Sequence, residues 1–576
     1  MRYNFVHIAL VLGVCVIALN SCGSGAGKAG SVLRIRIQEE PDCLNPIVSQ
    51  SGLATQIEYQ LMAEMFEYNP SKLELEAVLL KDLGQSKTIN DSVIEYQYQF
   101  LDGATWDDQN PISSSDLEFT VKAALNPYIK NGAWRSSLKN VLSVREENKS
   151  CVVRVKKDYL LSQEISGNFN LYPKSIYDPN GLLDQFTIQD LRTKDSLSFS
   201  AEEHSKLKLF AEQFQGNEFC RKKISGAGPY RLKQWIPNSI IQLERKENHW
   251  SQSYVQTNPQ LSALPKEIDY IVIPDINTAL VELEKGSIDL VTNVTPKTFS
   301  SWKEDSKKNE KFSFYTPSLL QYSYIEVNHR NPILQDSLVR KALALLLPID
   351  QFIQSQMFGF AQRIIGPVHL SKEYYHKNLE PISFNPNQAK ILLEKAGWKD
   401  NNSDGLLDKA IGGKRTDLKL TLSTASQDLG KALGLLFQQE ANKIGVQIDV
   451  QQKEWSQALK EINSHEFDLC LVTSRQNPGD WDPFQNWHSS NIQKGGSNKS
   501  GYHSSIIDSL ISKIRTANTQ QERKEAYLQF QEIIYRDQAQ LFLYSPLERI
   551  ICSKRIQLQL SNRKPGYLEN RSAVLE

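Results

Sequence analysis

Two kinds of hydrophobic pattern alternate along the chain. Apolar and polar residues alternate with a period of two at 32–37 (VLRIRI) and 95–101 (EYQYQFL), which predicts strands. Residues 336–347 and 429–444 instead repeat apolar residues at helical spacing, and Gly445 ends the second of these segments. This succession of strands and helices predicts an α/β protein.

Strand–helix–strand spacing occurs in two separate parts of the chain. Residues 268–291 hold one such unit, and residues 418–472 hold a second, longer one. Units of this kind build mostly parallel sheets, so the pattern predicts two α/β lobes. Ligands of such folds bind at domain interfaces and at the carboxyl ends of strands. We therefore expect the binding site in a cleft between the lobes.

Charge and motifs exclude two classes of function. The 576 residues contain 66 Lys plus Arg and 66 Asp plus Glu, so the net charge is zero. Without a basic excess to neutralise a phosphate backbone, nucleic acid is excluded as a partner. No His-Glu-x-x-His or Gly-x-Ser-x-Gly motif occurs, and Ser136 and Lys139 have β-lactamase spacing without that family's partner motifs. The sequence predicts a binding protein and not an enzyme.

The N-terminus has the features of an export signal. Residues 6–19 form an apolar run of fourteen residues, interrupted by His7. A membrane span needs about 20 apolar residues, whereas a signal peptide needs fewer. The segment 19–22 (LNSC) resembles a lipobox, which implies cleavage before Cys22 and lipidation of its thiol. The alternative is an uncleaved anchor with an incidental cysteine. The small residues of 23–31 are typical of a flexible tether.

The mature chain keeps an odd number of further cysteines. Because five is odd, at least one stays unpaired or pairs between molecules. No two of them have Cys-x-x-Cys spacing, and their connectivity cannot be deduced from the sequence. These residues are Cys43, Cys151, Cys220, Cys470 and Cys552.

Several blocks, in order along the chain, resemble the extracellular solute-binding proteins of family 5, the peptide- and nickel-binding proteins that serve ABC importers. The chain departs from the family pattern at Gln109, where the family has Gly, and at Ala227, where it has Thr. The blocks are 41–46 (PDCLNP), 106–112 (WDDQNPI), 226–230 (GAGPY), 286–290 (GSIDL), 339–343 (VRKAL), 389–398 (AKILLEKAGW) and 479–483 (GDWDP).

The resemblance implies an α/β periplasmic-binding-protein fold of class II, the venus-flytrap fold, with an extra domain inserted in the first lobe. The hinge is expected near residues 318 and 540. The expected boundaries are 1–21 for the signal peptide, 22–30 for the tether, 31–72 with 225–318 and 540–576 for lobe I, 73–224 for the inserted domain, and 319–539 for lobe II.

The resemblance also implies a function. We expect a substrate-binding lipoprotein of the cell envelope that captures di- or oligopeptides and delivers them to the permease and ATPase subunits of an ABC importer. It is expected to be a monomer without a cofactor, held to the membrane through lipid at Cys22. The alternatives are a binding protein for another small solute, such as a metal chelate or a sugar, and a sensor or scaffold lipoprotein without a role in transport.

Two charged residues are the strongest ligand-binding candidates. In peptide-binding members, an Asp at the position of Asp480 takes the ligand's α-amino group, and a carboxylate suits an ammonium because charge-assisted hydrogen bonds are strong. Arg475 is suited to a ligand carboxylate because its guanidinium is a bidentate fork. The alternatives are a turn-forming Asp480 beside Pro483 and an ion pair within the lobe for Arg475.

Six further residues are expected at the cleft. The tryptophans would stack on ligand side chains, with a core position as the alternative. The asparagine would place a loop at the cleft mouth, and the tyrosines share one face of the strand that enters lobe II. These residues are Trp455, Trp481, Trp487, Asn45, Tyr322 and Tyr324.

One loop copies part of a calcium site. Oxygen-bearing side chains at Asp400, Asn402, Asp404 and Asp408, with Gly405 at the sixth position, match the first part of an EF-hand loop. Position 12 is an isoleucine, so the bidentate Glu is missing. The loop is therefore a weak calcium candidate, with a plain surface turn as the alternative.

Overall fold

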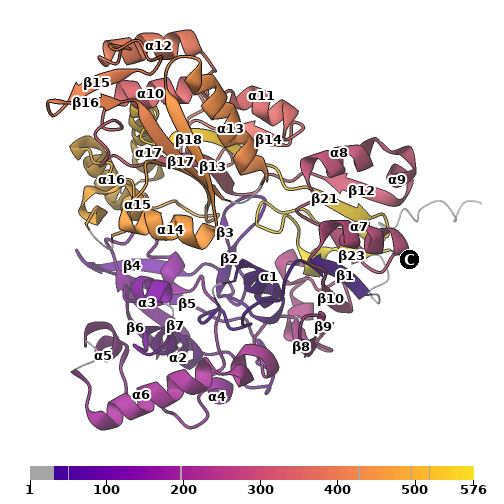
Figure 1. Cartoon of the computed structure of the whole chain (residues 1–576). Helices are drawn as coiled ribbons and strands as arrows, with labels where there is room; N and C mark the ends of the chain where they lie inside the picture. The colour runs from indigo at the N-terminus through magenta and orange to yellow at the C-terminus, as the bar shows by residue number, and fades with distance from the viewer. Residues whose placement is uncertain are drawn as a thin grey trace, which may run out of the picture.

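Two large mixed sheets form the centres of two lobes (Figure 1). The computed structural model describes residues 32–49, 51–130, 132–194, 198–425, 428–493, 496–517 and 519–575. The predicted signal peptide, the lipidation site at Cys22 and the tether lie outside these residues.

The lobe I sheet has the strand order β12-β21-β11-β1-β10-β9-β8. The parallel pair of β1 and β10 lies at its centre, and the hairpin β8–β9 extends one edge. Its strands are β1 (Val32–Ile37), β8 (Tyr230–Ile236), β9 (Ile240–Arg245), β10 (Glu267–Val272), β11 (Leu290–Val291), β12 (Phe312–Tyr315) and β21 (Ile550–Ser553), and its helices are α1 (Gly52–Leu61), α7 (Ile276–Lys285), α8 (Pro296–Glu304) and α9 (Ser306–Lys311).

The lobe II sheet has the order β14-β20-β13-β19-β17-β18 and is surrounded by helices (Figure 1). Its strands are β13 (Gln321–Val327), β14 (Ala361–Arg363), β17 (Lys419–Ala425), β18 (Gln447–Lys453), β19 (Leu469–Arg475) and β20 (Leu541–Pro546). The helices are α10 (Ser337–Leu345), α11 (Ile349–Ser355), α12 (Pro386–Lys395), α13 (Asp428–Asn442), α14 (Trp455–Ser464), α15 (Phe484–Trp487), α16 (Ser505–Thr516) and α17 (Gln520–Asp537), with the hairpin β15 (Asp408–Ile411) and β16 (Lys414–Asp417).

A third, antiparallel sheet of order β4-β5-β7-β6 forms a separate layer below lobe II in Figure 1. Its elements fall within the range expected for the inserted domain. They are β4 (Gln85–Asn90), β5 (Val93–Tyr98), β6 (Val141–Glu147) and β7 (Ser150–Lys156), with α2 (Ser114–Leu125), α3 (Gly132–Leu138), α4 (Lys174–Tyr177), α5 (Ile188–Thr193) and α6 (Ala201–Phe214). Two short ribbons, β2 (Phe66–Tyr68) with β3 (Leu75–Ala77) and β22 (Ile556–Gln557) with β23 (Ala573–Val574), complete the strands described.

Packing divides the molecule into two bodies and not three. One continuous cluster of buried apolar residues runs from Leu33 in β1 through Val153 in β7 to Phe210 in α6. Lobe II has clusters of its own, including Leu343, Leu422 and Phe437. Because burial of apolar surface is the main stabilising contribution to folding, a shared core ties the inserted domain to lobe I. We expect these two parts to move together against lobe II.

A disulfide strengthens the same connection. Cys43, in the loop after β1, is bonded to Cys220, which follows α6, with a separation of 177 residues in the sequence. The other described cysteines, Cys151, Cys470 and Cys552, are free and buried. The bond closes the inserted domain onto lobe I.

The predicted boundary at residue 540 is wrong by several residues. β20 pairs with β13 and with β14, so 541–546 belongs to the lobe II sheet. The chain returns to lobe I only after Pro546, and β21 pairs there with β11 and β12. The hydrophobic pattern of these residues does not reveal which sheet the strand joins. The two crossovers are the β12–β13 and β20–β21 connections.

No helix among the described residues is long and apolar enough to span a membrane.

Candidate functional site

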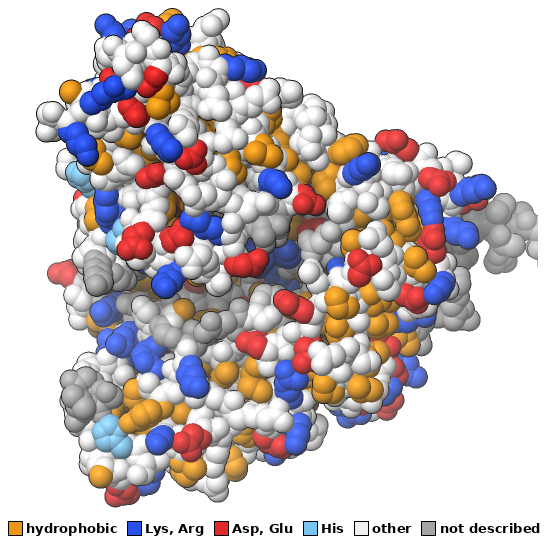
Figure 2. All heavy atoms as spheres, viewed as in Figure 1, with side chains coloured by type: hydrophobic (Ala, Val, Ile, Leu, Met, Phe, Trp, Pro, Cys, Tyr) orange, Lys and Arg blue, Asp and Glu red, His pale blue; other side chains and the backbone are white. Residues whose placement is uncertain are grey.

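Two cavities lie where lobe II meets the rest of the molecule. The first, of about 1020 Å³, is the Asp480 cavity, with Tyr68 and Glu164 on one wall and Asp480 and Arg523 on the other. The second, of about 750 Å³, is the Arg475 cavity, lined by lobe I residues together with Arg475. Figure 2 shows the hollow between lobe II and the parts below it. Residues 475–480, which continue from the end of β19, border both cavities.

The loop that carries Asp480 is fixed by side chains of its own lobe. Lys372 Nζ donates to the carbonyl oxygen of Asn477 at 2.7 Å and to those of the next two residues. Tyr374 Oη accepts from the backbone N–H of Trp481 at 3.0 Å. Burial lowers the pKa of Lys372 to about 8, against the raising effect of the nearby Asp480 carboxylate. The position of Asp480 is therefore set before any ligand arrives.

The Asp480 carboxylate itself is accessible. Its Oδ2 lies 3.1 Å from Arg523 Nη1, and about a third of the side chain (34%) is exposed to the cavity. Arg523 is held in turn by the carbonyl oxygen of Ile514 at 3.3 Å. A carboxylate has about four acceptor positions, so this one contact leaves Asp480 able to accept from a ligand cation.

The opposite wall approaches Asp480 closely. A Cβ atom built on Gly479 would overlap with the Tyr68 phenol, so the two bodies touch here and only a residue without a side chain fits. Tyr68 Oη donates to Glu164 Oε1 at 2.5 Å. Burial raises the pKa of Glu164, and the negative charge of Asp480 raises it further. A second carboxylate therefore faces the first across the cleft.

The Arg475 cavity is lined by side chains of both charges, with a small excess of cations that includes Arg475 and Lys564. A Cβ atom on Gly52, the first residue of α1, would lie 3.0 Å from Arg475 Nη1, so the guanidinium reaches the N-terminus of that helix. Lys564 lines the same cavity, and its pKa is lowered by burial and then by the charge of Arg475, against the pull of Glu548. Within the described part of the chain, neither Arg475 nor Lys564 has a side-chain hydrogen bond or ion pair. Two unpaired cations beside the positive end of a helix dipole attract an anion.

Some of the residues predicted at the site lie in the core instead. Asn45 is 1% exposed and donates to the carbonyl oxygen of Phe214, so it braces lobe I against the inserted domain. Trp487 is 2% exposed and packs edge-on against Phe530. Tyr322 and Tyr324 are also buried and stack on each other in lobe II. None of these four side chains lines either cavity, and the structure favours the core alternative for the three aromatic residues. Inward-facing aromatic residues of a strand or helix have the same sequence pattern whether they meet a ligand or a core.

Two other predicted tryptophans lie elsewhere. Trp481 is half-buried against Phe530, and its backbone carbonyl accepts a hydrogen bond from Tyr527 Oη. Trp455 begins α14, is 46% exposed, and is not among the residues lining either cavity. Of the eight predicted ligand residues, Asp480 and Arg475 line the cavities.

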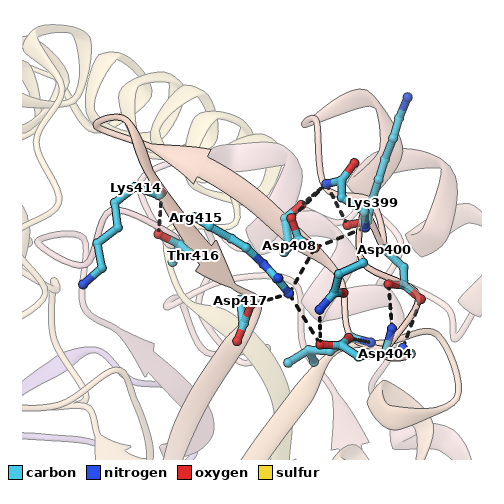
Figure 3. A network of polar contacts seen from close by, with 12 residues as sticks. Lys399, Asp400, Asp404, Asp408, Lys414, Arg415, Thr416 and Asp417 are labelled. Atoms are coloured by element: carbon cyan, nitrogen blue, oxygen red, sulfur yellow. Dashed lines mark hydrogen bonds and ion pairs between the residues drawn. The ribbon is translucent and has the colours of Figure 1, made fainter.

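The calcium candidate is occupied by a protein cation (Figure 3). Arg415 Nη2, from β16, lies 3.4 Å from Asp404 Oδ2, 3.5 Å from Asp408 Oδ2 and 3.4 Å from Asp417 Oδ1. Asp400 accepts backbone N–H groups of its own loop. No group of three or more His, Cys, Asp or Glu residues in the described ranges is arranged to hold a metal. The negative charge of the loop is thus neutralised by Arg415, which lies outside the twelve-residue motif.

The sequence did not identify several residues that line the cavities. They come from segments far from the blocks that carry the resemblance, and no local motif marks them. They are Tyr68, Glu164, Lys372, Tyr374, Arg523, Tyr527 and Lys564.

Two bodies joined by two crossovers, with a cleft whose walls come from both, define a two-lobe solute-binding protein of the venus-flytrap type. The chain belongs to the bacterial extracellular solute-binding proteins of family 5, whose middle-region model matches residues 79–496. The predicted family and fold class are confirmed.

The relatives match between half and nearly all of the chain. The oligopeptide-binding protein AppA of Bacillus subtilis is 26% identical over 568 residues, 95% of this chain and 94% of that protein. The dipeptide-binding protein of Escherichia coli is 25% identical over 318 residues, 54% of each chain.

Solved structures share the fold. AppA in complex with a nonapeptide has a TM-score of 0.71 at 22% identity, covering 96% of this chain and all (100%) of that one. NikA from Brucella suis in complex with Fe(III)-EDTA has a TM-score of 0.75 at 17% identity, covering 94% and 99%.

Proposed function

We propose that this protein is the peptide-capturing lipoprotein of an ABC importer. The observation that carries the proposal is a pair of unlike groups in the two cavities: an accessible carboxylate, Asp480, in one, and the unpaired cations Arg475 and Lys564 in the other. A peptide with free ends carries an ammonium and a carboxylate, which match these two charges. The names of the relatives, which describe oligopeptide and dipeptide binding, support the proposal.

The spacing of the charges favours short peptides. Residues 475–480 span at most about 17 Å, since a chain extends by about 3.3 Å per residue. An extended peptide of about five residues has the same length. We therefore expect tri- to hexapeptides to bind with the amino end at Asp480 and the carboxylate at Arg475 and Lys564.

Membrane anchoring and delivery to the importer are proposed from the sequence. Lipid at Cys22 and the tether would hold the protein at the membrane, where the permease and its ATPase receive the peptide. The ligand is released unchanged, with no catalytic step and no cofactor. Capture shifts the population of the two bodies toward the closed state, because only in that state does the ligand contact both bodies, lobe II through Asp480 and Arg475 and lobe I through Lys564.

Calorimetry tests this function with one peptide in four forms: with free ends, N-acetylated, C-amidated, and blocked at both ends. Penta-alanine with free ends should bind with micromolar or tighter affinity. N-acetylation should weaken binding by at least tenfold, because it removes the ammonium, and C-amidation should do the same at the other end. A protein that ignores all four peptides but binds a metal chelate or a sugar would establish the alternative function.

A further inference from the structure

Glu164 is a mostly buried carboxylate with few partners. It begins a short helical turn (Glu164–Ser166) of the inserted domain and lines the Asp480 cavity. Among the described side chains, Tyr68 is the one that donates a hydrogen bond to it. Burial is the largest cause of its raised pKa, so the ionised form lacks the solvation it would have in water.

The protein supplies no ion pair to this carboxylate. Arg523 contacts Asp480 and lowers the pKa of Glu164 only from a distance. The three lysines that line the cavity are engaged elsewhere: Lys372 with backbone carbonyls, Lys524 with Glu373 and Lys72 with Glu76. Across the described residues, Glu164 has no cation within ion-pair distance. Its negative charge is thus left for something that enters the cavity.

Glu164 and Asp480 belong to the two bodies that move relative to each other. Glu164 is tied to Tyr68, and the Tyr68 ring lies directly against Gly479, the residue before Asp480. The two carboxylates are close enough for the charge of Asp480 to raise the pKa of Glu164. When the cleft is empty, closure therefore brings two like charges together, which costs free energy in a partly buried site.

We propose that Glu164 and Asp480 form a two-carboxylate pocket that grips the α-ammonium of the ligand from both sides of the cleft. This inference rests on the proposed peptide-binding function and adds a second recognition residue, supplied by the inserted domain. An ammonium has three N–H donors, enough to bond to both carboxylates at once. Placed between them, it turns repulsion between the two bodies into attraction. The amino end of the peptide then selects the ligand and also holds the cleft closed.

A double-mutant cycle tests the pocket. Glu164→Gln, Asp480→Asn and the double variant are each titrated with penta-alanine and with its N-acetylated form in a calorimeter. In the wild type the free peptide should bind at least tenfold more tightly than the acetylated one. In Glu164→Gln we expect this ratio to fall by about tenfold. In the double variant the ratio should fall by less than the product of the two single-variant effects, because both residues contact the same ammonium group.

The controls distinguish a failure of the proposed peptide binding from a failure of the two-carboxylate pocket. Glu74→Gln is the matched control, because Glu74 is exposed at the rim of the same cavity and its loss should leave the ratio unchanged. The ratio compares two peptides on one variant, so partial unfolding does not change it. If Glu164→Gln does not fold, Glu164→Asp, which keeps the charge but shortens the side chain, should lower the ratio to an intermediate value. A wild type that binds no peptide refutes the proposed function, whereas wild-type binding with an unchanged ratio in the Glu164 variants overturns the pocket alone.

Discussion

At the residue scale, Asp480 was predictable from the family resemblance and Arg475 from its position just after a strand, whereas other residues at the cleft were not predictable. Asp480 and Arg475 follow the buried strand β19, and the structure places both at the cleft. Glu164 and Lys564 reach the same cavities from segments more than 80 residues away in the sequence. No local pattern connects them to the site, because their positions depend on how the bodies pack.

Two buried carboxylates give the stability of the fold a pH dependence. Burial raises the pKa of both Glu326 and Glu569 to about 7. Glu326 accepts a hydrogen bond from the Gln540 side chain, and Glu569 accepts one from the Gln56 side chain. A raised folded-state pKa gives stability that is complete below the ordinary value near 4.5 and is lost as pH rises through about 7.

We therefore expect the free energy of unfolding to decrease between pH 5 and pH 8. Glu326→Gln, which stays neutral, should remove a part of this decrease on the order of 3 kcal/mol or less. Urea unfolding at several pH values measures the effect, and Glu310→Gln at an exposed position is the control. An unchanged slope in Glu326→Gln would show that Glu326 is ionised throughout.

At the scale of elements, the hydrophobic pattern of the sequence predicted the alternation of strands and helices but not which strands pair with each other. The predicted strand–helix–strand unit at 418–472 ends in β19 at 469–475, and the predicted helix at 429–444 is α13 at 428–442. Residues 541–546 (β20) were assigned to lobe I, because their pairing with β13 is a long-range contact that no local pattern shows. The hairpin β15–β16 likewise supplies Arg415 to a loop that resembles a calcium site when its own residues are considered alone.

The Arg415 cluster predicts a stability effect that depends on salt. Arg415→Gln leaves three carboxylates without their shared cation. Because Arg415, Asp404 and Asp417 are about half exposed, although Asp408 is buried, we expect a loss of up to about 1 kcal/mol. The loss should shrink at high salt, where exposed charges are screened. Urea unfolding at two ionic strengths tests this, with Lys414→Gln in the same hairpin as the control. Stabilisation of the wild type by calcium would contradict the account of the loop.

At the scale of the whole molecule, the resemblance correctly gave two lobes with a cleft. The sequence did not show that the inserted domain shares one core with lobe I or that Cys43 pairs with Cys220. Both facts join the same two parts, so closure is a movement of lobe II against the rest.

The contact between Gly479 and Tyr68 predicts that closure of the cleft requires a glycine at position 479. Gly479→Ala should keep the two bodies from meeting and weaken peptide binding by about tenfold or more, because the added Cβ overlaps with the phenol. Gly430→Ala in α13 is the matched control, since a Cβ there would make an ordinary contact at 3.4 Å. Equal peptide affinity in wild type and Gly479→Ala, measured by calorimetry, would show that the bodies do not need this contact.

Small-angle scattering tests most directly the central claim that the cleft closes on a peptide held by its two charged ends. The radius of gyration of the wild type is measured alone, with saturating penta-alanine, and with the same peptide acetylated and amidated. We expect a smaller radius with the free peptide and an unchanged radius with the blocked one at equal concentration. An unchanged radius at saturation with the free peptide, or equal shrinkage with both peptides, would contradict it.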